Sequence, residues 1–241
     1  MQVFSFQVCP RCEKIIIESG KLCQNCKRTL REERDFFLDT LIAATKYKEN
    51  NLSKIIHLYK YNFIRDLSVP LGKILVKAFL DNNLPLPDFI VPVPLHSRRL
   101  RWRGFNQSEL LADYVSQNLT PGLEIPVLKD ILIRKKHTPP QMKVKKYAER
   151  RKNIQDAFEI NIKCHPELVS GSNKPKKLDS GSEAGMTTGD LLKKKTILLV
   201  DDIATTGATL NECARILKSA GAKKVFALVL ARQEMSKKRV T

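Results

Sequence analysis

The chain has 241 residues, 42% of them hydrophobic, which is enough to bury the core of one large domain or of one domain with a small appendage. Lysine and arginine outnumber aspartate and glutamate by 43 to 25, and the formal charge of +18 favours an anionic partner, either nucleic acid or a phosphorylated small molecule. The apolar run at residues 225–231 is far shorter than the roughly 20 residues of a membrane helix, so no membrane span is expected.

The N-terminal residues carry no basic region followed by an apolar one, as an export signal would, so a cytoplasmic location is expected. Two C-x-x-C pairs follow, and together they can complete the tetrahedral sulfur shell that suits zinc. We therefore predict a structural zinc ribbon over residues 1–33, in which the metal supplies the free energy of folding. Two disulfides or a redox dithiol are the alternatives. The expected zinc ligands are Cys9, Cys12, Cys23 and Cys26.

Residues 34–241 are predicted to form an α/β domain. Hydrophobic periodicity predicts helices at residues 52–60, 67–78 and 107–118, and a further helix that ends near Gly221. Short apolar runs predict strands at residues 88–95, 196–200 and 224–231. Strands that are apolar throughout and separated by helices indicate a parallel sheet covered on both faces. Cys213 falls at a helical position and is predicted to be a small buried hydrophobe.

Residues 163–195 do not fit this pattern. They have no sustained apolar period, they are rich in serine, glycine, lysine and proline, and the tripeptide SGS occurs in them twice. Such a composition predicts a flexible insertion and not a further domain.

The stretch "ILLVDDIATTGATL", residues 197–210, joins a strand to two acids and a threonine-rich loop. Asp201 and Asp202 can accept hydrogen bonds from the vicinal hydroxyls of a ribose. The loop offers backbone N–H groups, hydroxyls and the positive end of a helix dipole to a phosphate. The pattern predicts a ribose 5-phosphate site; a metal-binding acid pair and a solvated acidic turn are the alternatives. The expected phosphate-binding residues are Ala204, Thr205, Thr206, Gly207, Ala208 and Thr209.

This stretch resembles the 5-phosphoribosyl 1-pyrophosphate (PRPP) signature of type I phosphoribosyltransferases, with a mild departure at Ala204, where a bulkier residue is usual. With the four cysteines, "VPVPLHSRRLRWRGFNQSELLA" (residues 91–112) and "RKKHTPPQMKVKKYAERRKNIQDAF" (residues 134–158), the chain resembles the ComF family of competence-associated, amidophosphoribosyltransferase-like proteins. The resemblance covers nearly the whole chain except the insertion. It implies a type I phosphoribosyltransferase fold, a parallel sheet flanked by helices, with a small N-terminal zinc ribbon.

The resemblance also implies roles for the two basic stretches. The first would be a pyrophosphate loop, in which arginine binds phosphate oxygens bidentately. The second would be a hood that closes over PRPP and excludes water, and Mg²⁺ would accompany the diphosphate. Alternatively, both stretches are solvated basic surfaces. The implied pyrophosphate-loop residues are Leu95, His96, Ser97 and Arg98, and the implied hood residues are Thr138, Gln141, Arg150 and Arg151.

Two functions fit these patterns. In the favoured one, the resemblance implies a PRPP-binding protein that handles single-stranded DNA during DNA uptake, with a helicase of the competence machinery as a candidate partner. In the alternative, the protein is an active phosphoribosyltransferase that transfers ribose 5-phosphate from PRPP to an unidentified acceptor. Neither an acceptor pocket nor a catalytic residue can be identified from the sequence. Trp102 and Phe105, interleaved with basic residues, could stack on bases or could pack within a loop.

Overall fold

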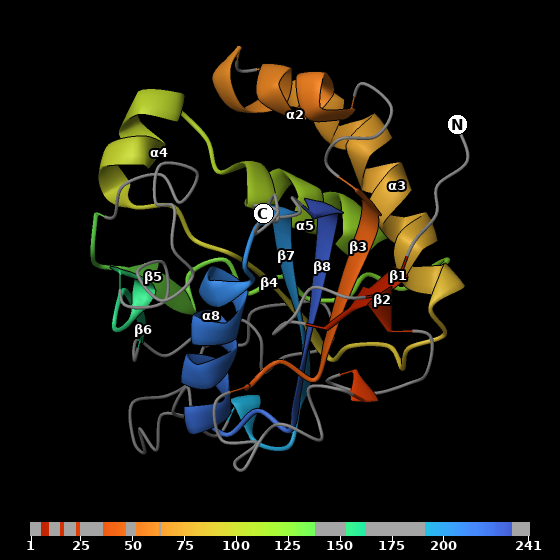
Figure 1. Cartoon of the computed structure of the whole chain (residues 1–241), viewed down its shortest axis with the longest axis vertical. Coiled ribbons are helices and arrows are strands. Elements are labelled where there is room, and N and C mark those ends of the chain that lie inside the picture. Colours follow the sequence, from red (N-terminus) through yellow and green to blue (C-terminus); the bar gives the residue numbers. More distant parts are fainter. Residues whose placement is uncertain are drawn as a thin grey trace, which may run out of the picture.

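The structure is a computed structural model, and it describes residues 6–9, 15–16, 23–24, 36–46, 52–62, 64–137, 153–161 and 191–232. A six-stranded sheet with the strand order β2-β1-β3-β8-β7-β4 forms the centre of this part of the chain. Strands β3 (Thr40–Lys46), β8 (Lys224–Arg232), β7 (Thr196–Ala204) and β4 (Phe89–Pro92) run parallel. Their carboxyl ends therefore meet at one edge of the sheet, the edge nearest helix α2 in Figure 1.

The remaining two strands extend the sheet beyond β3, at the edge opposite β4. β1 (Phe6–Val8) pairs antiparallel with β3, and β2 (Ile15–Ile16) pairs antiparallel with β1. The first residues of the chain thus share a sheet with the α/β domain.

Both faces of the sheet are buried, because apolar side chains alternate between them along each strand. On β7, Ile197 and Leu199 join one core cluster, whereas Leu198 and Val200 join the other. Helices cover these two faces. They are α2 (Leu52–Tyr61), the 3₁₀ helix η2 (Arg65–Leu67), α3 (Ser68–Asp81), α4 (Ser97–Arg103), α5 (Gln107–Asn118) and α8 (Ala208–Ser219).

Helices α3 and α5 pack against one face of the sheet, and α8 packs against the other (Figure 1). Cys213 of α8 is fully buried, which confirms its prediction as a core residue, and burial raises the pKa of its thiol. A short antiparallel pair, β5 (Leu132–Arg134) and β6 (Phe158–Ile160), lies beside α8. These layers confirm the predicted α/β class with a mostly parallel sheet. Among the described residues, none of the helices has the length and apolarity that crossing a bilayer requires.

The structure differs from the sequence expectations at several places. β3 was not predicted, although it pairs with β8 inside the sheet. β7 continues through both acids to Ala204 instead of ending at residue 200. Residues 97–103 form helix α4 and not a loop, because His96 caps the start of the helix and Gly104, at φ 77°, ends it. Leu192 is fully buried, so the last residues of the predicted insertion pack into the core.

Some expected features lie outside the described residues. These are two of the four cysteines, most of the insertion and the implied hood residues: Cys12, Cys26, residues 163–190, Thr138, Gln141, Arg150 and Arg151.

Candidate functional site at the end of strand β7

A pocket opens at the carboxyl edge of the sheet and encloses about 770 Å³ of space that is open to solvent. In open α/β sheets, ligands bind at this edge. The lining combines two acids, three basic side chains and two threonine hydroxyls with apolar residues from the β4 side. The lining residues are Lys60, Tyr61, Val93, Pro94, Leu95, Arg99, Gln107, Arg134, Asp201, Asp202, Ile203, Thr205 and Thr209.

Asp202 is the more deeply buried of the two acids, with 2% of its surface exposed. Its Oδ1 forms an ion pair of 2.9 Å with Lys60 Nζ from the last turn of α2. Its Oδ2 is buried and has no hydrogen-bond partner among the described residues. Because an unsatisfied buried acceptor is costly, this oxygen is prepared to accept a hydrogen bond from a ligand.

Asp201 is held by a different set of contacts. Its Oδ1 accepts a hydrogen bond from Ser108 Oγ at 2.8 Å and another from the backbone N–H of Asp202 at 2.9 Å. Burial, followed by repulsion from Asp202, raises the pKa of Asp201 to about 7. The charge of Lys60 and the two hydrogen bonds partly offset this increase. The acid pair can therefore hold one proton near neutral pH.

The loop between β7 and α8 combines hydroxyls with a left-handed turn. Thr205 and Thr206 are buried, and Thr206 Oγ1 accepts a hydrogen bond from Ala208 N at 3.3 Å. Gly207 has φ 70° and immediately precedes the first turn of α8. A side chain here would have room, because an added Cβ would meet only Leu41 Cδ2 at 3.9 Å, but the backbone conformation favours glycine. The loop thus directs threonine hydroxyls and a helix N-terminus toward the pocket, as an anion requires.

The opposite wall comes from the segment that follows β4. Leu95 lines the pocket, and His96 Nδ1 accepts a hydrogen bond from Arg98 N at 3.2 Å, which caps α4. The His96 ring also contacts the ring of His137, at 5.1 Å between centroids. Desolvation and then the charge of His137 lower the pKa of His96. Ser97 and Arg98 are exposed and do not line the pocket.

A buried hydrogen-bond network holds α2 against α4 and α5. Tyr59 Oη donates to the backbone oxygen of Gln107 at 2.9 Å, and burial raises the pKa of this phenol. Arg103 donates to the Gln107 side-chain oxygen. These contacts fix the end of α2, and they thereby position Lys60 and Tyr61 at the pocket.

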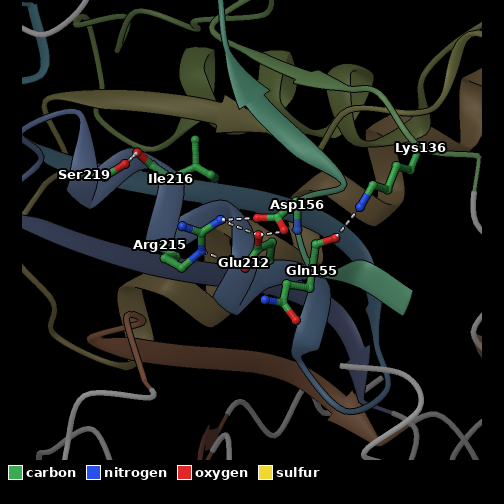
Figure 2. Close-up of polar contacts among 7 residues, drawn as sticks. All are labelled: Lys136, Gln155, Asp156, Glu212, Arg215, Ile216 and Ser219. Carbon is green, nitrogen blue, oxygen red and sulfur yellow. Dashed lines mark hydrogen bonds and ion pairs between the residues drawn. The ribbon is translucent and has the colours of Figure 1, made fainter. Parts of the chain in front are cut away.

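A second network ties the arms of the implied hood to α8 (Figure 2). Glu212 Oε1 accepts a hydrogen bond from Asp156 N at 3.0 Å, and Arg215 binds both Glu212 and Asp156. Asp156 has φ 53°, so a sharp turn is held here by a helix side chain. On the other arm, Lys136 Nζ donates to the backbone oxygen of Gln155 at 3.1 Å. Residues 136 and 155 are therefore joined to each other, and residue 156 is joined to the helix that begins at the threonine loop.

The structure brings together several of the predicted site residues and adds others. Asp201, Asp202, Thr205, Thr209 and Leu95 line one pocket, although their roles stay predictions. In the described part of the two basic stretches, Arg99 and Arg134 line the pocket and the expected Arg98 does not. The residues that the sequence interpretation missed are Lys60, Tyr61, Arg99, Gln107, Ser108 and Arg134. Arg99 and Arg134 could have been found, since both belong to the basic stretches.

The described part of the N-terminal segment contains two of the expected zinc ligands. Cys9 is fully buried, and Cys23 packs against it together with Ile16 and Phe36. Cysteines from both C-x-x-C pairs therefore share one small cluster, which fits a common sulfur-ligand site. The zinc ion itself stays a prediction.

Known proteins resemble this chain over most of its length. The profile of the phosphoribosyl transferase domain matches residues 106–241. Competence protein F of Haemophilus influenzae (strain ATCC 51907 / DSM 11121 / KW20 / Rd) is 31% identical over 235 residues, which cover 96% of this chain and 87% of that protein. DNA utilization protein YhgH of Salmonella typhi is 28% identical over 229 residues, or 93% of this chain and 84% of that protein.

These matches define the class of the protein. The chain belongs to the phosphoribosyltransferase domain family and, within it, to the ComF family. Among solved structures, the purine phosphoribosyltransferase from Pyrococcus horikoshii Ot3 is 15% identical, with 70% of this chain and 87% of that chain covered and a TM-score of 0.31. That similarity is too low to add to the assignment.

Proposed function

We propose that the pocket at the end of β7 binds PRPP together with Mg²⁺. The observation that carries the proposal is Asp202, whose buried Oδ2 has no hydrogen-bond partner among the described residues and whose other oxygen is paired with Lys60. Asp201 lies beside it, so two acceptors face the pocket at neighbouring positions. A vicinal diol supplies the two hydroxyl donors that such a pair requires.

The other walls of the pocket suit the phosphates of PRPP. Thr205, Thr209 and the start of α8 would hold the 5-phosphate, because hydroxyls and a helix N-terminus favour an anion. Arg99 and Arg134 would face the diphosphate. The acids offer the oxygen ligands that Mg²⁺ prefers, and the ion would neutralise the diphosphate while it keeps several waters.

We propose further that the protein acts in DNA uptake and handles single-stranded DNA. What supports this role is the similarity to proteins named competence protein F and DNA utilization protein, together with the formal charge of +18. A helicase of the competence machinery stays the candidate partner, and the cytoplasmic location expected from the sequence stays a prediction.

An active phosphoribosyltransferase is the second candidate. The observation that favours it is the open extent of the pocket, which continues from the acids to Tyr61 and Gln107 and so would leave room for an acceptor beside the ribose site. Transfer would require positioning and charge neutralisation more than a strong base. We assign no catalytic residue.

Isothermal calorimetry with PRPP, with and without Mg²⁺, tests the central proposal. We expect binding at one site per chain that weakens when Mg²⁺ is removed. Ribose 5-phosphate should compete with PRPP, because it would occupy the acid pair and the threonine loop. The absence of PRPP binding in the presence of Mg²⁺ would contradict the proposal. Diphosphate release during a screen of bases and amines would separate a transferase from a protein that only binds PRPP.

We also propose that Cys9 and Cys23 bind zinc together with Cys12 and Cys26. Elemental analysis of purified protein should find about one zinc ion per chain. Cys23→Ser should lose the metal, because a structural site needs all four ligands. Cys213→Ala is the matched control, since this thiol lies in the core beneath α8 and its removal should leave the zinc content unchanged. Metal-free wild-type protein with disulfides between these cysteines would contradict the zinc site.

A further inference from the structure

Three aromatic side chains from α2 and α4 form an exposed cluster beside the pocket. The rings of His57 and Tyr61 lie 4.5 Å apart between centroids, and the ring of Trp102 meets that of Tyr61 edge-on at 6.2 Å. Trp102 is 61% exposed and Tyr61 is 43% exposed. Large exposed aromatic side chains that contact one another are typical of a binding surface. We refer to His57, Tyr61 and Trp102 as the aromatic surface.

Contacts of Arg103 and Arg65 hold this surface in place. The guanidinium group of buried Arg103 lies 5.7 Å from the Tyr61 ring centroid and donates to the Gln107 side chain. Arg65 Nη2 donates to the backbone oxygen of Gly104 at 3.1 Å, which ties η2 to the end of α4. Phe105, by contrast, is only 7% exposed and belongs to the core. The structure therefore separates Trp102, at the surface, from Phe105, which packs inside.

Positive charge lies on the same face of α4 as Trp102. Arg98, Arg101 and Trp102 follow the i, i+3, i+4 spacing that places side chains on one face of a helix, and all three are exposed. In the sequences of α2, η2 and α4, Asp66 is the acid that interrupts a series of lysines and arginines. These groups suit a partner that presents both negative charge and planar rings.

We propose that the aromatic surface stacks with unpaired bases of single-stranded DNA, while Arg98 and Arg101 contact its phosphates. The inference rests on the proposed DNA-handling function for the identity of the polymer. In a duplex, neighbouring base pairs cover the faces of the bases, so exposed aromatic rings select unpaired bases. Arginines provide the contacts that do not depend on sequence.

The location of this surface links DNA to the pocket. Tyr61 belongs both to the aromatic surface and to the lining of the pocket. Helices α2 and α4 both lie beyond the carboxyl ends of the parallel strands in Figure 1. A bound strand would therefore pass close to the mouth of the pocket, with its bases toward Trp102.

The composition of the chain allows a direct test, because Trp102 is its single tryptophan. Intrinsic tryptophan fluorescence of the 241-residue chain therefore reports on this surface alone. Titration with an oligothymidylate at low salt should quench the emission as bases stack on the indole. A duplex of the same length should quench it less. Equal quenching by the duplex, or by free thymidine at the same base concentration, would overturn the proposal.

Substitutions separate stacking from charge. Fluorescence anisotropy of a labelled oligothymidylate should show about tenfold weaker binding for Trp102→Ala, with an unchanged dependence on salt. Trp102→Phe should lose less affinity, since it keeps a ring. Arg101→Gln should instead flatten the slope of log affinity against log salt by about 0.7. Leu123→Ala is the matched control, because it truncates another exposed apolar side chain, on the turn after α5.

PRPP calorimetry on the same variants distinguishes the outcomes. Trp102 does not line the pocket, so Trp102→Ala should bind PRPP as the wild type does, which also shows that it is folded. If the wild type binds oligothymidylate without quenching, and Trp102→Ala binds it equally well, the proposed role of the aromatic surface is overturned. The proposed DNA-handling function is then retained. If the wild type binds no oligothymidylate even at low salt, the proposed DNA-handling function and the proposed role of the aromatic surface are both overturned. The proposal of PRPP binding is then tested separately by calorimetry.

Discussion

The two walls of the pocket are built in opposite ways. On the β7 wall, polar groups are buried and specifically paired: Asp202 with Lys60, and Asp201 with Ser108. On the α4 wall, Arg99 lines the pocket, its neighbours Arg98 and Trp102 lie in solvent outside the lining, and the helix is fixed by its caps and by buried Arg103. Both walls were expected from the sequence to bind phosphate-bearing ligands, yet only the first is preorganised inside the protein.

The difference predicts how each wall will respond to mutation and to salt. Water does not replace a buried carboxylate. Its removal therefore costs the full free energy of the hydrogen bond and leaves its partner unpaired. An exposed arginine is hydrated and screened, so its loss costs little and matters less as salt increases. We therefore expect large, salt-independent effects at β7 and small, salt-dependent effects at α4.

The largest effect is expected for Asp202→Ala. Removal of a carboxylate that accepts hydroxyl hydrogen bonds should cost roughly 1.5–3 kcal/mol, or about a 10- to 150-fold loss of PRPP affinity in calorimetry. Asp201→Ala should fall in the same range. Asp81→Ala is the matched control, because it breaks an exposed Asp–Lys pair with Lys77 on α3, outside the pocket lining. Unchanged PRPP affinity in both β7 variants would remove the distinction between the walls.

The next effect concerns Gly207, whose φ of 70° is strained for other residues. Gly207→Ala should destabilise the fold by about 1 kcal/mol, measured by urea denaturation, and should also weaken PRPP binding several-fold. Gly122 is the matched control, with φ 75° in a turn where a Cβ meets nothing. Gly122→Ala should lose similar stability but keep its PRPP affinity. Equal PRPP affinity in the two variants would show that the threonine loop does not bind the ligand.

The sequence predicted the parts of this pocket that depend on local pattern. The helix at 107–118 and the strand at 224–231 have clear periodicities or apolar runs, and the structure confirms both as α5 and β8. β3 was missed because a short apolar run does not distinguish strand from helix, and its strand identity comes from pairing with β8.

The partners of the acids could not be predicted in this way. Lys60 and Ser108 lie more than ninety residues before Asp201 and Asp202 in sequence, and only the packing of α2 and α5 brings them to β7. Nothing in the residues around Lys60 distinguishes it from a surface lysine. Similarly, the contact between Tyr61 and Trp102 joins two elements that no local sequence pattern pairs.

A further effect should appear as a pH dependence of stability, which arises on the buried wall. The pKa of Asp201 is raised from 3.8 to about 7, so between these values the folded protein holds a proton that the unfolded chain releases. The stability that protonated Asp201 contributes to the folded protein is therefore lost as the pH rises from about 4 to about 7. Asp201→Asn should remove this dependence, so its Tm relative to wild type should rise by roughly 5 °C between pH 5 and pH 8. Parallel Tm curves would show that Asp201 titrates normally.

The smallest effect is expected on the exposed wall, where two adjacent arginines offer a matched pair. Arg99 lines the pocket, whereas Arg98 is exposed outside it. Arg99→Gln should weaken PRPP binding about fivefold at low salt, and the loss should shrink as salt screens the remaining charges. Arg98→Gln should change PRPP affinity less than about twofold and stability by less than about 0.5 kcal/mol. Calorimetry of both variants at two salt concentrations measures the difference. A larger loss for Arg98→Gln would return this residue to the pyrophosphate-binding role that the sequence suggested, and would mean that α4 rearranges when PRPP binds.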